Sequence, residues 1–115
     1  MAQTIYQGDE KKFAIELTAP GFDIDQDDFE LEVKSPKVSI KASKKAPTTA
    51  LCIFAEEVTP QGGTPYNVWY AIVDTATLSS GQIDVIATAL VPDANANDGI
   101  RRESAVATLG TLKIK

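Results

Sequence analysis

The sequence predicts an all-β sandwich or small barrel, and three observations lead to this prediction. Apolar and polar side chains alternate with a period of two through most of the chain. Glycine, proline, asparagine and aspartate interrupt this alternation at short intervals, as turns do between strands. No run of typical helix length shows helical periodicity. About eight strands at this spacing are typical of two packed antiparallel sheets.

We expect strands with one buried face and one solvent-exposed face where the alternation is strictest. A short strand precedes Gly8, and two short pieces close the chain at residues 105–109 and 112–114. Residues 74–78 are too few for more than a turn. The remaining alternating segments are residues 13–18, 29–34, 38–43 and 83–91.

Two segments in the middle, residues 51–55 and 68–73, are apolar on both faces. They indicate central strands that are covered on both sides within one subunit, although the same faces also suit a contact between subunits. Trp69 and Tyr70 are adjacent and therefore point to opposite faces. We expect one ring to anchor the core and the other to pack under a loop or at an interface. Cys52 lies in the first segment and is expected to be a small buried hydrophobe.

Length and composition exclude several classes of protein. The chain has 115 residues, which fits a single domain over residues 1–115. Its net charge is −5, with 16 acidic against 11 basic residues, so phosphate backbones would repel it and nucleic-acid binding is not expected. No signal peptide and no apolar run of membrane-spanning length is recognisable. A single cysteine precludes an intrachain disulfide and fits folding inside a cell.

The sequence shows no recognisable catalytic set. There is no histidine, which excludes a Ser-His-Asp triad and a histidine-based zinc site. Gly62-Gly63 is too short to cradle a phosphate. No pair of acids stands in a context that would tune it for acid–base work. We therefore expect a protein that is not an enzyme, with no cofactor and no catalytic, cofactor-binding or metal-binding residues.

Two acidic loops have a spacing that is partly similar to a calcium-binding loop. Residues 23–28 alternate aspartates, but Asp28 stands where a glycine is needed and Lys34 stands where the closing glutamate should be. Residues 92–99 alternate aspartate and asparagine, but Gly99 comes one position late and no glutamate follows. We interpret both as hydrated turns held by local side-chain caps. The second loop is the better calcium candidate of the two.

Three segments together resemble a family of phage virion proteins. The opening Ile5-Tyr6-Gln7-Gly8-Asp9, followed by a strand, resembles the start of the immunoglobulin-like N-terminal domain of baseplate upper proteins of tailed phages. Leu78-Ser79-Ser80-Gly81 resembles a turn that leads into a late strand of that domain. The stretch from Pro92-Asp93 to Asp98-Gly99-Ile100-Arg101-Arg102-Glu103 is similar to a segment of small virion proteins from phages and prophages of gut Bacteroidetes.

This resemblance implies an immunoglobulin-like antiparallel β-sandwich of about 7–9 strands. It also implies a structural component of a tailed-phage particle, in the baseplate, tail, neck or capsid decoration. Such a protein folds in the cytoplasm of the bacterial host and ends in the virion. Its partners are other virion proteins and further copies of itself, with no nucleic acid and no membrane.

We expect the contacts of such a protein in the tip at residues 60–65 and in the loop at residues 93–102, because loops on a rigid sandwich often carry contacts. Residues 2–7 and 113–115 could add strands to a neighbouring subunit. The alternative function is a calcium- or carbohydrate-binding β-sandwich module, and a small enzyme is the weakest hypothesis.

Overall fold

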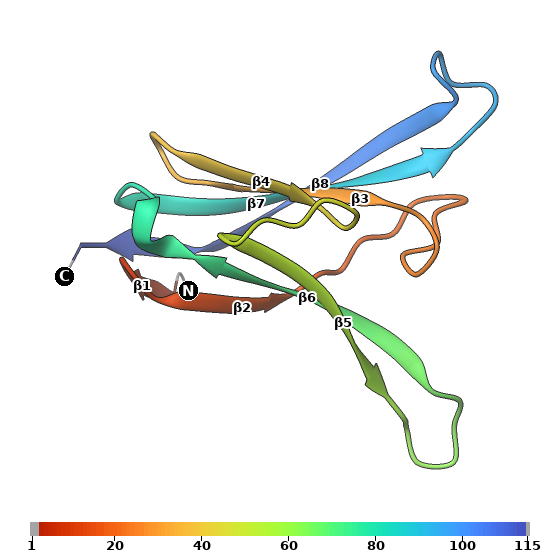
Figure 1. The fold of residues 1–115 in the computed structure, drawn as a ribbon, viewed down its shortest axis with the longest axis horizontal. Helices are drawn as coiled ribbons and strands as arrows, with labels where there is room; N and C mark the ends of the chain where they lie inside the picture. Colours follow the sequence, from red (N-terminus) through yellow and green to blue (C-terminus); the bar gives the residue numbers. More distant parts are fainter. Residues whose placement is uncertain (1–2, 115) are drawn as a thin grey trace.

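The computed structural model describes residues 3–114, which form two β-sheets packed face to face (Figure 1). This confirms the predicted all-β sandwich. The elements in chain order are β1 (Thr4–Tyr6), β2 (Glu10–Ala14), β3 (Phe29–Lys34), β4 (Ser39–Ser43), β5 (Leu51–Val58), β6 (Tyr66–Asp74), the short 3-10 turn η1 (Thr75–Thr77), β7 (Gly81–Pro92) and β8 (Ile100–Lys113). No helix in this part of the chain is long and apolar enough to cross a membrane.

The strand order is that of an immunoglobulin sandwich. Sheet A has the order β1-β8-β7-β3-β4, and sheet B has the order β2-β6-β5. All neighbours are antiparallel except β1 and β8, which are parallel. Strands β2, β6 and β5 take the places of strands B, E and D, and β8, β7 and β3 those of G, F and C. Within residues 3–114, no strand fills the place of strand A beside β2.

The core lies between the two sheets and follows the alternation of the strands. On β3, Phe29, Leu31 and Val33 are buried while the intervening residues face outward. The same alternation runs through all of β7, so the prediction of half-buried strands over residues 29–34 and 83–91 is confirmed. Phe29 meets Trp69 from the other sheet edge-to-face, with ring centroids 5.9 Å apart. Trp69 is thus the ring of the adjacent aromatic pair that anchors the core.

Two predicted strands differ in their bounds from the observed ones. The strand expected over residues 13–18 is β2, which ends at Ala14 after pairing with β6. Ile15 and Leu17 are buried beyond its end, and apart from the Ile15 N–H, which donates to the Trp69 carbonyl at 2.8 Å, their alternation reports burial and not strand pairing. The two closing pieces are one continuous strand, β8, with a bulge opposite Ile83 and Asp84.

The two ends of the described chain pair with each other. Thr4–Tyr6 lies parallel to Thr111–Lys113, and the Thr111 N–H donates to the Gln3 carbonyl at 2.7 Å. A Cβ atom on Gly110 would lie 2.3 Å from that same carbonyl oxygen, so β1 can approach β8 only beside a glycine. The strand additions expected from residues 2–7 and 113–115 are therefore used within the chain, and Ala2 and Lys115 lie outside the described residues.

The turn between β6 and β7 is pinned by a buried hydroxyl. Thr75 is fully buried at the start of η1. Its hydroxyl donates to the Asp9 carbonyl at 2.7 Å and accepts from the Gly8 N–H at 3.0 Å. These bonds fasten the turn that leads from β1 of sheet A to β2 of sheet B to the end of β6, the neighbour of β2 in sheet B. The prediction that residues 74–78 form only a turn is confirmed.

Candidate functional site

The two segments predicted to carry contacts lie on different sheets. Residues 60–65 are all exposed and join β5 to β6, with the Gly63 N–H bonded to the Pro60 carbonyl at 3.0 Å. Residues 93–99 join β7 to β8. Figure 1 shows the two hairpins diverging, so that their tips point away from each other. The structure therefore does not bring these two segments together into one site.

The loop over residues 93–99 is a tight turn, as predicted. The Asp93 N–H donates to the Gly99 carbonyl at 2.9 Å, and the Asn95 N–H donates to the Asp93 carboxylate at 3.0 Å. Arg101 bonds the same carboxylate and also the Glu103 carboxylate at 2.8 Å. Arg101 also donates to the carbonyl of Pro20, which ties this loop to the chain that leaves β2.

The carboxylates of this loop are held in the ionised form. The Asn95 N–H and the Arg101 guanidinium keep the pKa of Asp93 below its ordinary value of 3.8. The hydrogen bond from Arg102 and that from the Ile100 N–H lower the pKa of Asp98 in the same way. These groups stabilise the turn as carboxylates, and they are not poised to exchange a proton near neutral pH.

The other acidic loop, residues 23–28, folds around a lysine. The Lys44 ammonium donates to the carbonyls of Ile24, Asp25 and Asp27 at 2.9, 2.7 and 3.2 Å. It also lies 4.6 Å from the centre of the Trp69 ring. The ammonium group thus already binds three backbone carbonyls of this loop. Within residues 3–114, no three histidine, cysteine or acidic side chains are grouped so that they could hold a metal ion.

The aspartates of this loop act as local caps. The Asp25 N–H donates to the Asp23 carboxylate and the Asp23 N–H donates to the Asp27 carboxylate, each at 2.9 Å. The Asp25 carboxylate accepts the indole N–H of Trp69 at 2.8 Å. The interpretation as a turn with side-chain caps is thus confirmed, and the sequence pattern did not reveal the part played by Lys44.

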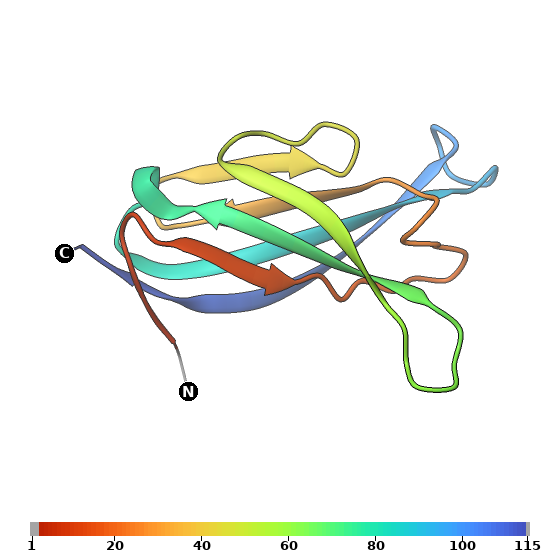
Figure 2. The ribbon, with the colours of Figure 1, turned by 60° about the horizontal axis from the view of Figure 1, so that its bottom comes forward.

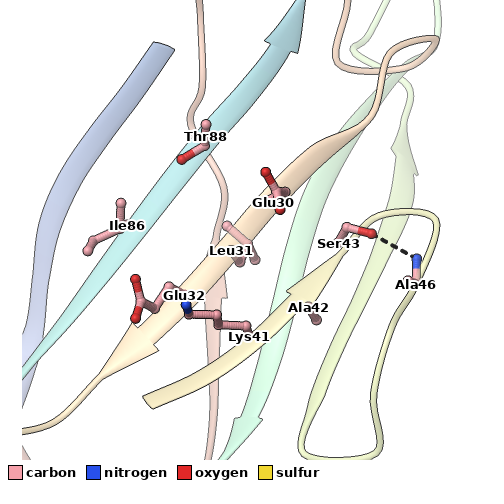
Figure 3. Close-up of a pocket in the computed structure, with 9 residues that line it drawn as sticks. All are labelled: Glu30, Leu31, Glu32, Lys41, Ala42, Ser43, Ala46, Ile86 and Thr88. Atoms are coloured by element: carbon pink, nitrogen blue, oxygen red, sulfur yellow. Dashed lines mark hydrogen bonds between the residues drawn. The ribbon is translucent and has the colours of Figure 1, made fainter. Parts of the chain in front are cut away.

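A shallow hollow of about 430 Å³ lies on the outer face of sheet A (Figure 3). Glu30 and Glu32 of β3, Lys41 of β4 and Thr88 of β7 line it. Its one drawn hydrogen bond runs from the Ala46 N–H to the Ser43 hydroxyl at 3.0 Å and shapes the turn after β4. The hollow is open to solvent and its charged groups are spread along separate strands. It has the character of a solvated sheet face.

The outer face of sheet B is the surface that differs most from an ordinary solvated face. The register of β5 on β6 places the buried Leu51 and Val73 on the inner face, so the alternate residues point outward. Within residues 3–114, no further layer crosses this face (Figure 2). Its side chains are Lys12, Ala14, Cys52, Phe54, Glu56, Val58, Tyr66, Val68, Tyr70 and Ile72, with Glu10 and Asp74 at one end.

This finding corrects two expectations. The two-faced apolar strands are not covered on both sides, because sheet B is three strands wide and its second face has no layer over it within residues 3–114. Cys52 is exposed instead of buried, since it points to that uncovered face. Tyr66, on the same face, is 54% exposed.

The aromatic rings of the face are ordered by contacts with one another. The rings of Phe54 and Tyr70 stack with centroids 6.0 Å apart and an interplanar angle of 28°. The Lys12 ammonium lies 4.4 Å from the Tyr70 centroid and 5.5 Å from that of Phe54. It also pairs with Glu56 at 2.8 Å. The face thus presents fixed apolar area with one charged pair within it.

No known protein family, curated protein or solved structure matches this chain. The signal for the exposed face was present in the sequence, as apolar residues on both faces over residues 51–55 and 68–73. That pattern does not distinguish a strand covered by its own chain from a strand that another molecule covers.

Proposed function

We propose that this chain is a structural subunit that acts through protein–protein contact, with the outer face of sheet B as its contact surface. The carrying observation is the run of apolar and aromatic side chains on β5 and β6 that no element within residues 3–114 covers. Contiguous exposed apolar area of this kind is typical of interaction sites, because its removal from water is favourable. Aromatic side chains are enriched at such contacts.

The assembly we propose is a tailed-phage particle, in which the chain contacts other virion proteins and further copies of itself. The resemblance of its turn segments to virion proteins supports this proposal, and so does a surface suited to contact. In the proposed life cycle, the chain folds in the bacterial host cytoplasm and is incorporated into the particle. No role in catalysis is proposed, since the chain has no histidine.

The single cysteine makes the contact surface measurable without any mutation. Cys52 lies on the proposed surface and is exposed in the free chain. A maleimide reagent is expected to label it readily in the isolated protein and slowly in purified particles. Equal labelling rates in both preparations would show that the outer face of sheet B is not a contact surface in the particle.

Membership of a particle has its own test. Particles induced from the source strain and purified are expected to contain this chain in a fixed ratio to the major capsid protein, measured by quantitative mass spectrometry. Particles that form without the chain would overturn the virion role. Protein–protein contact through sheet B would then still be open to the labelling test on other complexes.

One observation favours a second candidate, a carbohydrate-binding module. Rings on the outer face of sheet B, namely the exposed Tyr66 and the half-buried, stacked Phe54 and Tyr70, suit contact with the apolar faces of sugars. This function predicts that a soluble oligosaccharide quenches or shifts tyrosine-sensitive signals and raises the melting temperature. A glycan array without binding at micromolar protein would reject it.

A further inference from the structure

We propose that two copies of this chain join edge to edge through β8, antiparallel and around a two-fold axis at Ala105, so that sheet A continues from one copy into the other. This inference goes beyond the contact proposed for sheet B and uses a different surface. It rests on the pairing of β8, on the charges along its edge and on the groove beside it.

Most of one edge of β8 is unpaired. Along its other edge β8 pairs with β7 from Ile100 to Leu112, whereas β1 covers only Thr111–Lys113. The approach of Gln3 to Gly110 marks where this cover begins. Residues 101–109 therefore present backbone N–H and C=O groups that have no strand partner within the described chain.

The middle of this edge lacks the charges and prolines that usually prevent sheets from joining, whereas Arg101, Arg102 and Glu103 lie at one end of it and the bulge opposite Ile83 and Asp84 lies at the other. Natural edge strands are kept apart by charged side chains, proline or shortness. The other edge strands carry such charges, for example Lys11 and Lys12 on β2, Lys41 on β4, and Glu56 on β5. Residues 104–109 of β8 contain neither a charge nor a proline, and Val106 is 66% exposed in their middle.

A groove beside this edge provides apolar contact for an added strand. It lies between the start of the segment after β2 and the free part of β8, and its volume is about 390 Å³. Phe13, Ile15, Val85 and Leu109 are among its lining residues. An added strand would gain backbone hydrogen bonds from β8 and would cover part of this apolar lining, as in other cases of strand addition.

The charges on β8 determine the register in which β8 of a second copy would pair with it. The free segment 101–109 is centred on Ala105, so antiparallel pairing about that residue uses all of it. Arg102 then lies opposite Thr108 of the second copy and Glu103 lies opposite Ala107, with no like charges facing each other. An axis at Arg102 or Glu103 would place that residue opposite itself, and parallel pairing in register would do so for both.

Charged substitutions at Thr108 test this arrangement. Thr108 is exposed on the outer side of sheet A, where its hydroxyl donates to the Asp84 carboxylate of β7 at 3.3 Å, so the free energy of unfolding of each variant is measured beside its association. The native chain is expected to sediment as a dimer that dissociates on dilution. Thr108→Lys would face Arg102 of the second copy and weaken the dimer, whereas Thr108→Glu would strengthen it. Each change acts twice in the dimer, so we expect shifts of roughly three- to thirty-fold in the dissociation constant, in opposite directions.

Thr77→Lys is the matched control, because Thr77 is exposed in η1 and belongs neither to β8 nor to the outer face of sheet B. It is expected to leave the dimer unchanged, and Tyr66→Lys places the same charge on the outer face of sheet B to probe that surface separately. A chain that remains monomeric at millimolar concentration would overturn the β8 pairing, as would a dimer that Thr108→Lys does not weaken. A dimer weakened only by Tyr66→Lys would assign self-association to sheet B, which is the contact surface of the proposed function. Loss of the dimer in the Thr108→Lys variant would support the β8 pairing. It would not bear on the outer face of sheet B, whose role as a contact surface is tested by the labelling of Cys52.

Discussion

The ammonium group of Lys44 lies 4.6 Å from the centre of the Trp69 ring, and the three carbonyls it bonds belong to the loop at residues 23–28. The loop, the strand end after β4 and a core tryptophan are thus joined at one positive charge. This relationship explains how an acidic, glycine-poor loop is ordered without a metal ion. It also defines the first of four predictions.

Lys44→Met keeps the aliphatic stem and removes the charge, so the three hydrogen bonds and the contact with the indole face are lost. We expect the free energy of unfolding to fall by about 1–3 kcal/mol. Urea unfolding followed by fluorescence of the single tryptophan measures this change. Lys45→Met is the control, because Lys45 is exposed and its ammonium has no hydrogen-bond partner in residues 3–114. Equal losses for both variants would contradict the role of Lys44.

Thr75→Val preserves the shape of a fully buried side chain but removes its hydroxyl. The Gly8 N–H then loses its partner and the Asp9 carbonyl keeps only the Thr75 N–H, so we expect a destabilisation of about 1–2 kcal/mol. Thermal or urea unfolding measures this loss. Thr77→Val lies exposed in the same turn and should change stability little. A Thr75→Val protein as stable as the native one would show that the hydroxyl does not pin this turn.

Protonation of the Asp93 carboxylate in acid is expected to weaken the β7–β8 turn. Its pKa is lowered in the folded chain, so its contribution to stability is present above its ordinary value of 3.8 and is lost as the pH falls through the folded value. We expect the NMR carboxyl titration of Asp93 to have its midpoint below 3.8 in the native protein. Arg101→Met should raise that midpoint. A native midpoint at or above 3.8 would refute the pairing.

Gly110→Ala tests the close approach of β1 to β8. The new Cβ would meet the Gln3 carbonyl at 2.3 Å and the Ile5 side chain at 3.0 Å, so β1 has to move away. We expect the Thr111 amide, which bonds that carbonyl, to exchange with solvent faster by tenfold or more. Hydrogen exchange followed by NMR measures this. Unchanged protection of Thr111 would show that the added Cβ does not displace β1 from β8.

Much of the sandwich was predictable from the sequence, because the alternation of apolar and polar residues that marks a strand is a local pattern. Alternation identified β3 and β7 well, and the punctuation by glycine and proline placed the turns. The bounds of β2 were missed, since the buried Ile15 and Leu17 continue the alternation after pairing has ended. Period two reports which side of an extended chain is buried, and it does not report where a neighbouring strand stops.

The candidate surface was not predictable from the same patterns. Apolar residues on both sides of β5 and β6 indicated full cover, but the cover depends on how many strands and layers the whole fold supplies. The Lys44 contact was missed for a similar reason, because Lys44 and the loop it orders are separated along the chain and meet only through tertiary packing. Local spacing tests such a loop for a metal ion and does not reveal an ammonium from another segment.

The pairing of Thr4 with Thr111 has a consequence for synthesis on the ribosome. The longest strand of the fold, β8, is also the last of the described strands to be translated. It pairs with β7 along one edge and with β1 along the other. Until it emerges from the exit tunnel, the nascent chain holds one edge of β7 open and leaves β1 without any neighbour. Sheet A can therefore close only after β8 has been translated, and the unpaired strands of the earlier chain are open to other contacts until then.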